Sequence, residues 1–157
     1  MGLNPTIIDS PTRMIVGVSA QMSYSNMPIP QLWKKFKPMV EEIEHKKDEL
    51  FYAIQVYTND HFETFDPEKL FEVWAGVAVA DFNVLPNPFL CLVIPAGKYA
   101  VFTLVGQDIG GLYSKIIGEW IPNSSYAIAN RPHFQVMGDQ YKNNQPDSEE
   151  EVWFPIQ

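Results

Sequence analysis

One acidic side chain, Glu119, interrupts an otherwise apolar pattern between Tyr113 and Trp120. A carboxylate beside aromatic rings is an arrangement that attracts a lipophilic cation. At an effective dielectric constant near 20, two opposite charges 4 Å apart interact by up to about 4 kcal/mol before desolvation, and an aromatic face adds roughly 0.5 to 2 kcal/mol. The alternative is that Glu119 is solvated or caps a neighbouring backbone group. We predict that these three residues bind a ligand.

A second combination of acid and aromatic ring occurs twice, because the tripeptide Glu-Val-Trp is repeated 79 positions apart. In a strand, Glu72 shares a face with Trp74, and Glu151 shares a face with Trp153. An ordinary exposed sheet face accounts for both pairs, although an acid next to an aromatic ring also suits a pocket for cations. The further candidate ligand-binding residues are Glu151, Trp153, Phe134, Trp33 and Trp74.

The residues that most often hold metals or form catalytic motifs are few and dispersed. His45, His61 and His133 are scattered without the spacing of metal ligands, and Cys91 has no second cysteine to pair with. No Ser/His/Asp or Cys/His arrangement with a recognisable local signature occurs. We therefore expect no metal and no cofactor.

Charge and composition exclude other classes of protein. The 157 residues are 46% hydrophobic and carry a formal charge of −8, which is typical of a folded acidic protein. A nucleic-acid binder needs a Lys/Arg surface to displace counterions, so we expect no direct contact with nucleic acid. No long apolar run or leader is present, and we expect a cytoplasmic protein without membrane contact.

Two segments have the periodicity of amphipathic helices. Apolar residues recur with a period near 3.6 in residues 30–45 and in residues 109–121. Pro38 lies inside the first pattern and should kink or split that helix, and Pro122 closes the second.

The two halves of the chain correspond at a shift of 80 positions. Trp33 falls on Tyr113 within the helical patterns, and the strand-like run that starts at Ile54 falls on the run that starts at Phe134. Each helix is also preceded by a predicted strand. These two strands are residues 13–22 and 97–105.

The repeat predicts an α+β fold. A βαββ unit made twice, with pseudo-twofold symmetry, should form one antiparallel sheet with two main helices flanking a ligand groove. We place repeat one at about residues 12–80 and repeat two at about 89–157, within a single domain spanning 1–157. Residues 81–88 have the composition of a connection, and residues 141–150 that of a polar hairpin loop.

Three motifs carry a family resemblance. They are IPAGKYAVF at residues 94–102, LYSKIIGEWIPNSSY at 112–126 and EEVWFPIQ at 150–157. Together they resemble the GyrI-like effector-binding domain of AraC-type and MerR-type transcription regulators. The resemblance covers roughly residues 12–157, and we expect no DNA-binding domain beside it.

The resemblance implies a tandem βαββ fold whose groove accepts bulky aromatic or cationic compounds around an acidic centre. By motif, it places Glu119, Glu151, Trp153 and Tyr113 in the pocket. Relatives often carry an acid in the strand after the second helix, where this sequence has Gln135. This departure should weaken selectivity for cations.

Three functions fit these patterns. The first is a non-enzymatic module that binds drug-like aromatic or cationic molecules, either sequestering them or serving a separate transcription regulator. The second is a hydrolase of reactive lipophilic electrophiles, in which Tyr113 and Glu119 activate water. The third is a gyrase-inhibitor-like module whose acidic surface engages a protein.

Overall fold

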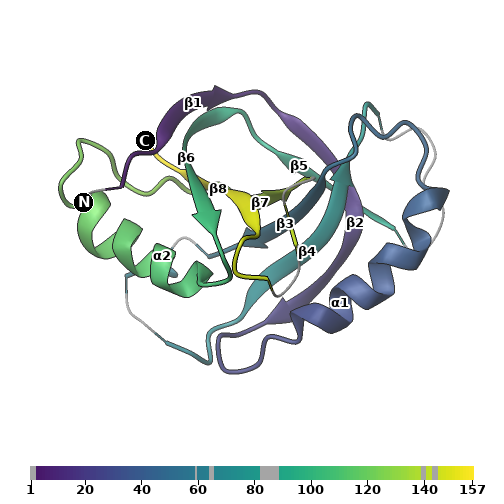
Figure 1. Cartoon of the computed structure of the whole chain (residues 1–157), viewed down its shortest axis with the longest axis horizontal. Helices are drawn as coiled ribbons and strands as arrows, with labels where there is room; N and C mark the ends of the chain where they lie inside the picture. The colour runs from purple at the N-terminus through teal and green to yellow at the C-terminus, as the bar shows by residue number, and fades with distance from the viewer. Residues whose placement is uncertain (1–2, 59, 64–65, 82–88, 139–140, 143–144) are drawn as a thin grey trace.

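The computed structural model describes residues 3–58, 60–63, 66–81, 89–138, 141–142 and 145–157. Each half of the chain has two strands, a helix with a short helical extension, and two more strands (Figure 1). The first half comprises β1 (Thr6–Ser10), β2 (Arg13–Met22), α1 (Ile29–Phe36), the 3₁₀ segment η1 (Lys37–Glu42), β3 (Phe51–Val56) and β4 (Phe71–Ala78). The second comprises β5 (Leu90–Ile94), β6 (Gly97–Val105), α2 (Ile109–Lys115), the π-helical segment η2 (Ile116–Trp120), β7 (His133–Met137) and β8 (Glu149–Pro155).

All eight strands form one antiparallel sheet in the order β1-β6-β8-β7-β3-β4-β2-β5. The halves meet at the central pair β7 and β3, where Ile54 lies opposite Phe134. These two residues are 80 positions apart, so the predicted repeat is confirmed as a structural symmetry about the middle of the sheet.

Each half has one strand more than the predicted βαββ unit. The additional strands β1 and β5 form the two edges, and each pairs with the other half: β1 with β6 and β5 with β2. They were missed because each has only five residues, whose alternation of exposed and buried positions is too short to indicate a strand. The expected start of repeat one near residue 12 therefore leaves out β1.

The helices follow the sequence pattern closely. Pro30 lies in the first turn of α1, and Leu32 and Phe36 are buried on its inner side. Pro38 ends the α-helical hydrogen bonding, and the chain continues as the 3₁₀ segment η1. The prediction that Pro38 splits this helix is confirmed.

Both helices cover the same face of the sheet, which we call the helix side. Helix α1 packs on β2 and β4, whereas α2 packs on β6 and β8. Figure 1 shows the two helices set apart with the central strands between them. The opposite face carries its own apolar cluster, to which Ile8 of β1 and Leu92 of β5 both contribute. The sheet is therefore curved, with this second cluster in its hollow.

The predicted loops fall partly outside the described residues. Of the connection at 81–88, only Asp81 is described. Within the predicted hairpin loop at 141–150, Glu149 and Glu150 belong to β8, and residues 143–144 lie outside the described part.

Candidate functional site

A cavity of about 570 Å³ opens on the helix side, between the segment that follows β3 and the segment that joins η2 to β7. Its volume lies within the range of small-molecule sites in proteins. The lining residues are Tyr57, Thr58, Phe62, Glu63, Ile121, Pro122, Ser124, Tyr126, residues 127–131, and His133.

Aromatic side chains form part of the cavity wall. The Tyr57 ring lies 4.3 Å from the ring of His61 and 4.8 Å from the ring of His133, measured between centroids. The Phe62 ring lies 5.4 Å from that of His133. We call the set the aromatic cluster. Its members are Tyr24, Tyr57, His61, Phe62, Phe71, Tyr113 and His133.

A tyrosine and a histidine form the floor of this cluster. The Tyr113 hydroxyl lies 3.1 Å from Nδ1 of His133, which is 2% exposed. Burial lowers the pKa of His133 to about 3 and raises the pKa of Tyr113. Both side chains are therefore uncharged at neutral pH, and the pair presents hydrogen-bonding atoms without a net charge.

Two lining residues carry formal charges. Glu63 is exposed, so it lies where the cavity meets solvent. The Arg131 guanidinium instead donates to the backbone carbonyls of Lys98 and Ile156, and it lies 5.2 Å from the Tyr99 ring centroid. The Arg131 guanidinium is therefore occupied by contacts within the fold. Of the two charged lining residues, Glu63 is the one whose charge could face a ligand.

A chain of polar side chains crosses the helix side of the central strands. The Gln55 amide lies 3.4 Å from the Gln135 side-chain oxygen, and the Gln135 amide donates in turn to the Glu150 carboxylate. Glu150 is 9% exposed, and burial raises its pKa. Within the described residues it forms no ion pair.

Glu150 was not among the candidates because residues 141–150 were predicted to form a loop. A signal was nevertheless present, since Glu150 alternates with Val152 and Phe154, which are both buried on the helix side. Because Val152 and Phe154 are core residues, an acid on the same face of the strand occupies a core position. It also restores a carboxylate next to Gln135, where the resemblance had indicated a departure from relatives.

The family model of the GyrI-like small molecule binding domain matches residues 3–157. The chain belongs to this family. A curated relative, the transcriptional regulator BrlR of Pseudomonas aeruginosa, is 29% identical over 124 residues, covering 74% of this chain and 43% of its own length. The GyrI-like domain thus spans less than half of that regulator.

Solved structures agree with the fold of this GyrI-like domain. SAV2435, determined bound to tetraphenylphosphonium, matches with a TM-score of 0.72 and 11% identity, over 99% of this chain and 94% of that one. The EcmrR C-terminal domain matches with a TM-score of 0.67 and 16% identity, over 100% and 99%. The expected α+β architecture, with two helices and an antiparallel sheet, is confirmed.

None of the eight predicted site residues of the GyrI-like domain lines the cavity. Two of them contact residues that do: Tyr113 contacts His133, and the Trp120 ring stacks 6.0 Å from that of Tyr126. The side chain of Glu119 is exposed, whereas the Tyr113 hydroxyl is directed to His133. The contacts therefore do not join Tyr113 and Glu119 into an acid–tyrosine pair.

The remaining predicted residues lie elsewhere. Trp33 packs edge-on against Phe36 and Phe51 under α1. In the hollow of the sheet, Phe134 stacks on Trp153, and Arg13 lies 4.8 Å from the Trp153 ring. The predicted placement of each acid beside its tryptophan is confirmed there. The indole of Trp74 donates to Glu72, and that of Trp153 donates to Glu151.

Clusters of metal-ligating side chains and membrane-length apolar helices are both absent from the described part of the chain. No group of three or more His, Cys, Asp or Glu side chains in it could hold a metal ion. No described helix has the length and apolar character needed to cross a bilayer.

Proposed function

We propose that this GyrI-like domain binds a lipophilic aromatic cation in the 570 Å³ cavity. The observation that carries the proposal is a cavity of ligand size walled by aromatic rings, with the carboxylate of Glu63 at its opening. The tetraphenylphosphonium bound to SAV2435, a protein of the same fold, is a compound of this class.

The binding energy would come mainly from apolar surface. Ligand rings would pack against Tyr57, Phe62 and Tyr126, and each Å² removed from water contributes roughly 25 cal/mol. A cation over an aromatic face adds roughly 0.5 to 2 kcal/mol. Because Glu63 is exposed, its contribution should be no more than about 1 kcal/mol.

The test compares a cation with a neutral compound of related shape. Tetraphenylphosphonium and triphenylphosphine oxide would be titrated into wild type and Glu63→Gln by calorimetry. We expect the substitution to weaken cation binding about two- to fivefold, as for an exposed charge pair, and to leave the neutral compound unaffected.

Glu119→Gln is the matched control, because Glu119 is an exposed acid outside the cavity lining. An equal loss for both compounds in Glu63→Gln would contradict the role of its charge. If only Glu119→Gln lost affinity for the cation, the carboxylate that attracts the cation would be that of Glu119, at the end of η2. If neither compound bound to wild type, the proposed function would be refuted.

We further propose that the domain reports its ligand to a transcription regulator. BrlR is such a regulator, and this chain aligns with less than half of it. We expect the domain to capture a separate transcription regulator only when ligand is present. Substitutions that prevent the cavity from binding ligand should abolish this capture.

A further inference from the structure

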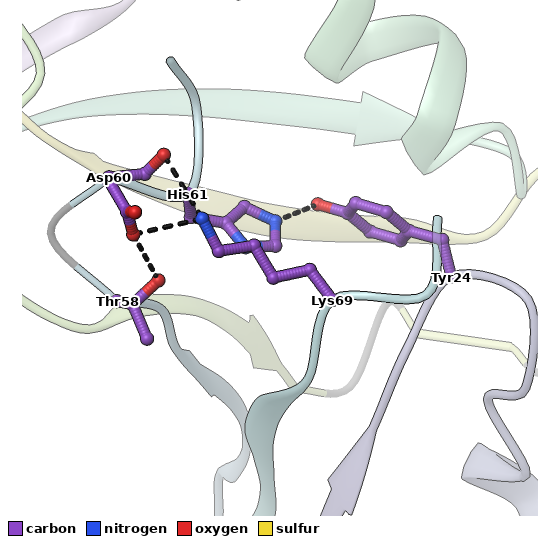
Figure 2. A network of polar contacts seen from close by, with 5 residues as sticks. All are labelled: Tyr24, Thr58, Asp60, His61 and Lys69. Atoms are coloured by element: carbon purple, nitrogen blue, oxygen red, sulfur yellow. Dashed lines mark hydrogen bonds and ion pairs between the residues drawn. The ribbon is translucent and has the colours of Figure 1, made fainter. Parts of the chain in front are cut away.

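His61 occupies the inside of the aromatic cluster although it belongs to a surface turn. Residues 60–63 form this turn, in which the His61 amide donates to the Thr58 carbonyl and the Glu63 amide to the Asp60 carbonyl. Asp60 and Glu63 are exposed, whereas His61 is 5% exposed. Figure 2 shows the imidazole directed inward to Tyr24 while Asp60 points the other way.

Rings surround the imidazole. Tyr57 and Phe62 lie 4.3 and 4.9 Å from it between centroids, and Tyr24 and Phe71 both lie 5.4 Å away. A box of aromatic rings at these separations is filled by one small flat ring. The ring of His61 therefore fills this aromatic box.

The hydrogen bonds of His61 suit a neutral imidazole. Its Nε2 lies 3.1 Å from the Tyr24 hydroxyl, and its Nδ1 is buried with no partner among the described residues. Protonation would put an N–H on both nitrogens, and the one at Nδ1 would have no acceptor in the described part of the chain. A buried donor or charge without a partner is costly, so the box disfavours the imidazolium.

The charged neighbours do not compensate. The Asp60 carboxylate is engaged by Lys69 Nζ at 2.9 Å and by the Thr58 hydroxyl at 2.9 Å (Figure 2). Burial, and then Lys69, lower the pKa of His61, and Asp60 opposes them only in part. The other titratable groups that face the ring are the hydroxyls of Tyr24 and Tyr57 and the uncharged His133.

We propose that His61 is an internal plug, which fills the aromatic box when neutral and is expelled when it takes up a proton. Expulsion would move the turn at 60–63 away from the cluster. Because Phe62 and Glu63 line the cavity, the cavity wall would open and the box would become available to a ring of the ligand. That consequence for binding rests on the proposed function, whereas expulsion itself does not.

Linkage sets the upper limit of the effect. Outside the box the imidazole regains its ordinary pKa near 6.5, whereas inside the box its pKa is lowered. Between pH 7.5 and 5.5, protonation should therefore shift the equilibrium toward the expelled state by up to about tenfold.

Hydrogen exchange tests this inference without any ligand. Exchange of peptides that contain His61 would be measured by mass spectrometry at pH 7.5 and 5.5, with the intrinsic pH dependence of exchange divided out. Wild type should lose protection there at pH 5.5, by up to about tenfold. His61→Phe keeps a ring in the box but cannot titrate, and it should show no such change.

Two further variants keep the result interpretable. His45→Gln removes an exposed histidine and should behave as wild type. His61→Gln, which is also unable to titrate, replaces His61→Phe if the larger ring prevents folding. An equal loss of protection in wild type and the non-titrating variant would overturn the inference. A domain that bound no ligand yet showed the expected difference would refute the proposed function and uphold the plug.

Discussion

At the scale of single residues, burial shifts the pKa values of titratable groups on the helix side toward their neutral forms. His133 is buried and Tyr113 is half-buried, and the two form a pair without charge at neutral pH, whereas Glu150 is a buried acid whose pKa is raised. The three shifts have the same cause, since charged forms lose hydration when they are buried. The pair of His133 and Tyr113 therefore offers polar atoms without charge, as suits lipophilic ligands.

The low pKa of His133 predicts a specific loss of stability in acid. In the unfolded chain His133 titrates near 6.5, whereas in the folded chain its pKa is about 3. Below pH 6.5 the unfolded state thus binds the additional proton, and the free energy of unfolding falls. From this residue alone the fall between pH 6.5 and 5 should be on the order of 1 to 2 kcal/mol.

Urea unfolding of wild type and His133→Phe at pH 6.5 and 5 measures this effect. The fall should be smaller in His133→Phe, and His61 should account for part of the remainder because its pKa is also lowered. His45→Gln is the control and should keep the full dependence. An identical pH dependence in wild type and His133→Phe would contradict the assignment.

At the scale of elements, α2 begins at a side-chain cap. The Asp108 carboxylate accepts a hydrogen bond from the Gly111 amide at 2.9 Å. A Cβ at position 111 would lie 2.2 Å from a carboxylate oxygen of Asp108, so a side chain there would require this carboxylate to shift. The helix then places Tyr113 two residues further on, above His133.

Loss of this cap should destabilise the protein measurably. Asp108→Ala removes the side-chain acceptor of the Gly111 amide and should lower the free energy of unfolding by about 1 kcal/mol, within a range of roughly 0.5 to 2. Asp108→Asn retains an acceptor and should cost less. Urea midpoints give both values, and equal effects of the two substitutions would show that the hydrogen bond is not the cause.

At the scale of the whole molecule, the two halves are tied together by exchange of their edge strands. β5 of the second half extends the first half beside β2, and β1 extends the second beside β6. When a half is isolated, two of its strands therefore lose a neighbour with which they pair in the whole protein. The central pairing of β3 with β7 adds a third junction.

Neither half should fold by itself. A fragment of residues 1–80 would expose one edge each of β2 and β3 and would leave β1 unpaired, so we expect no cooperative unfolding transition. Mixing it with residues 81–157 should restore the sheet. Circular dichroism and amide NMR dispersion report both states, and a cooperatively folded isolated half would contradict this expectation.

Local sequence patterns determined much of the fold. The bounds of β2 and β6, the split of the first helix at Pro38 and the repeat at a shift of 80 all follow from apolar periodicity and proline chemistry. These features depend on neighbours along the chain. The family resemblance rested on the same linear motifs, and the family match confirmed it.

Only the tertiary structure decided which residues meet. Periodicity shows that Trp74, Phe134 and Trp153 are buried but not which face of the sheet they occupy, and pairing placed them in the hollow, away from the cavity. His61 and His133 are 72 positions apart in sequence, and they come together because β3 pairs with β7. Contacts between distant segments depend on strand order and curvature, which no local pattern encodes.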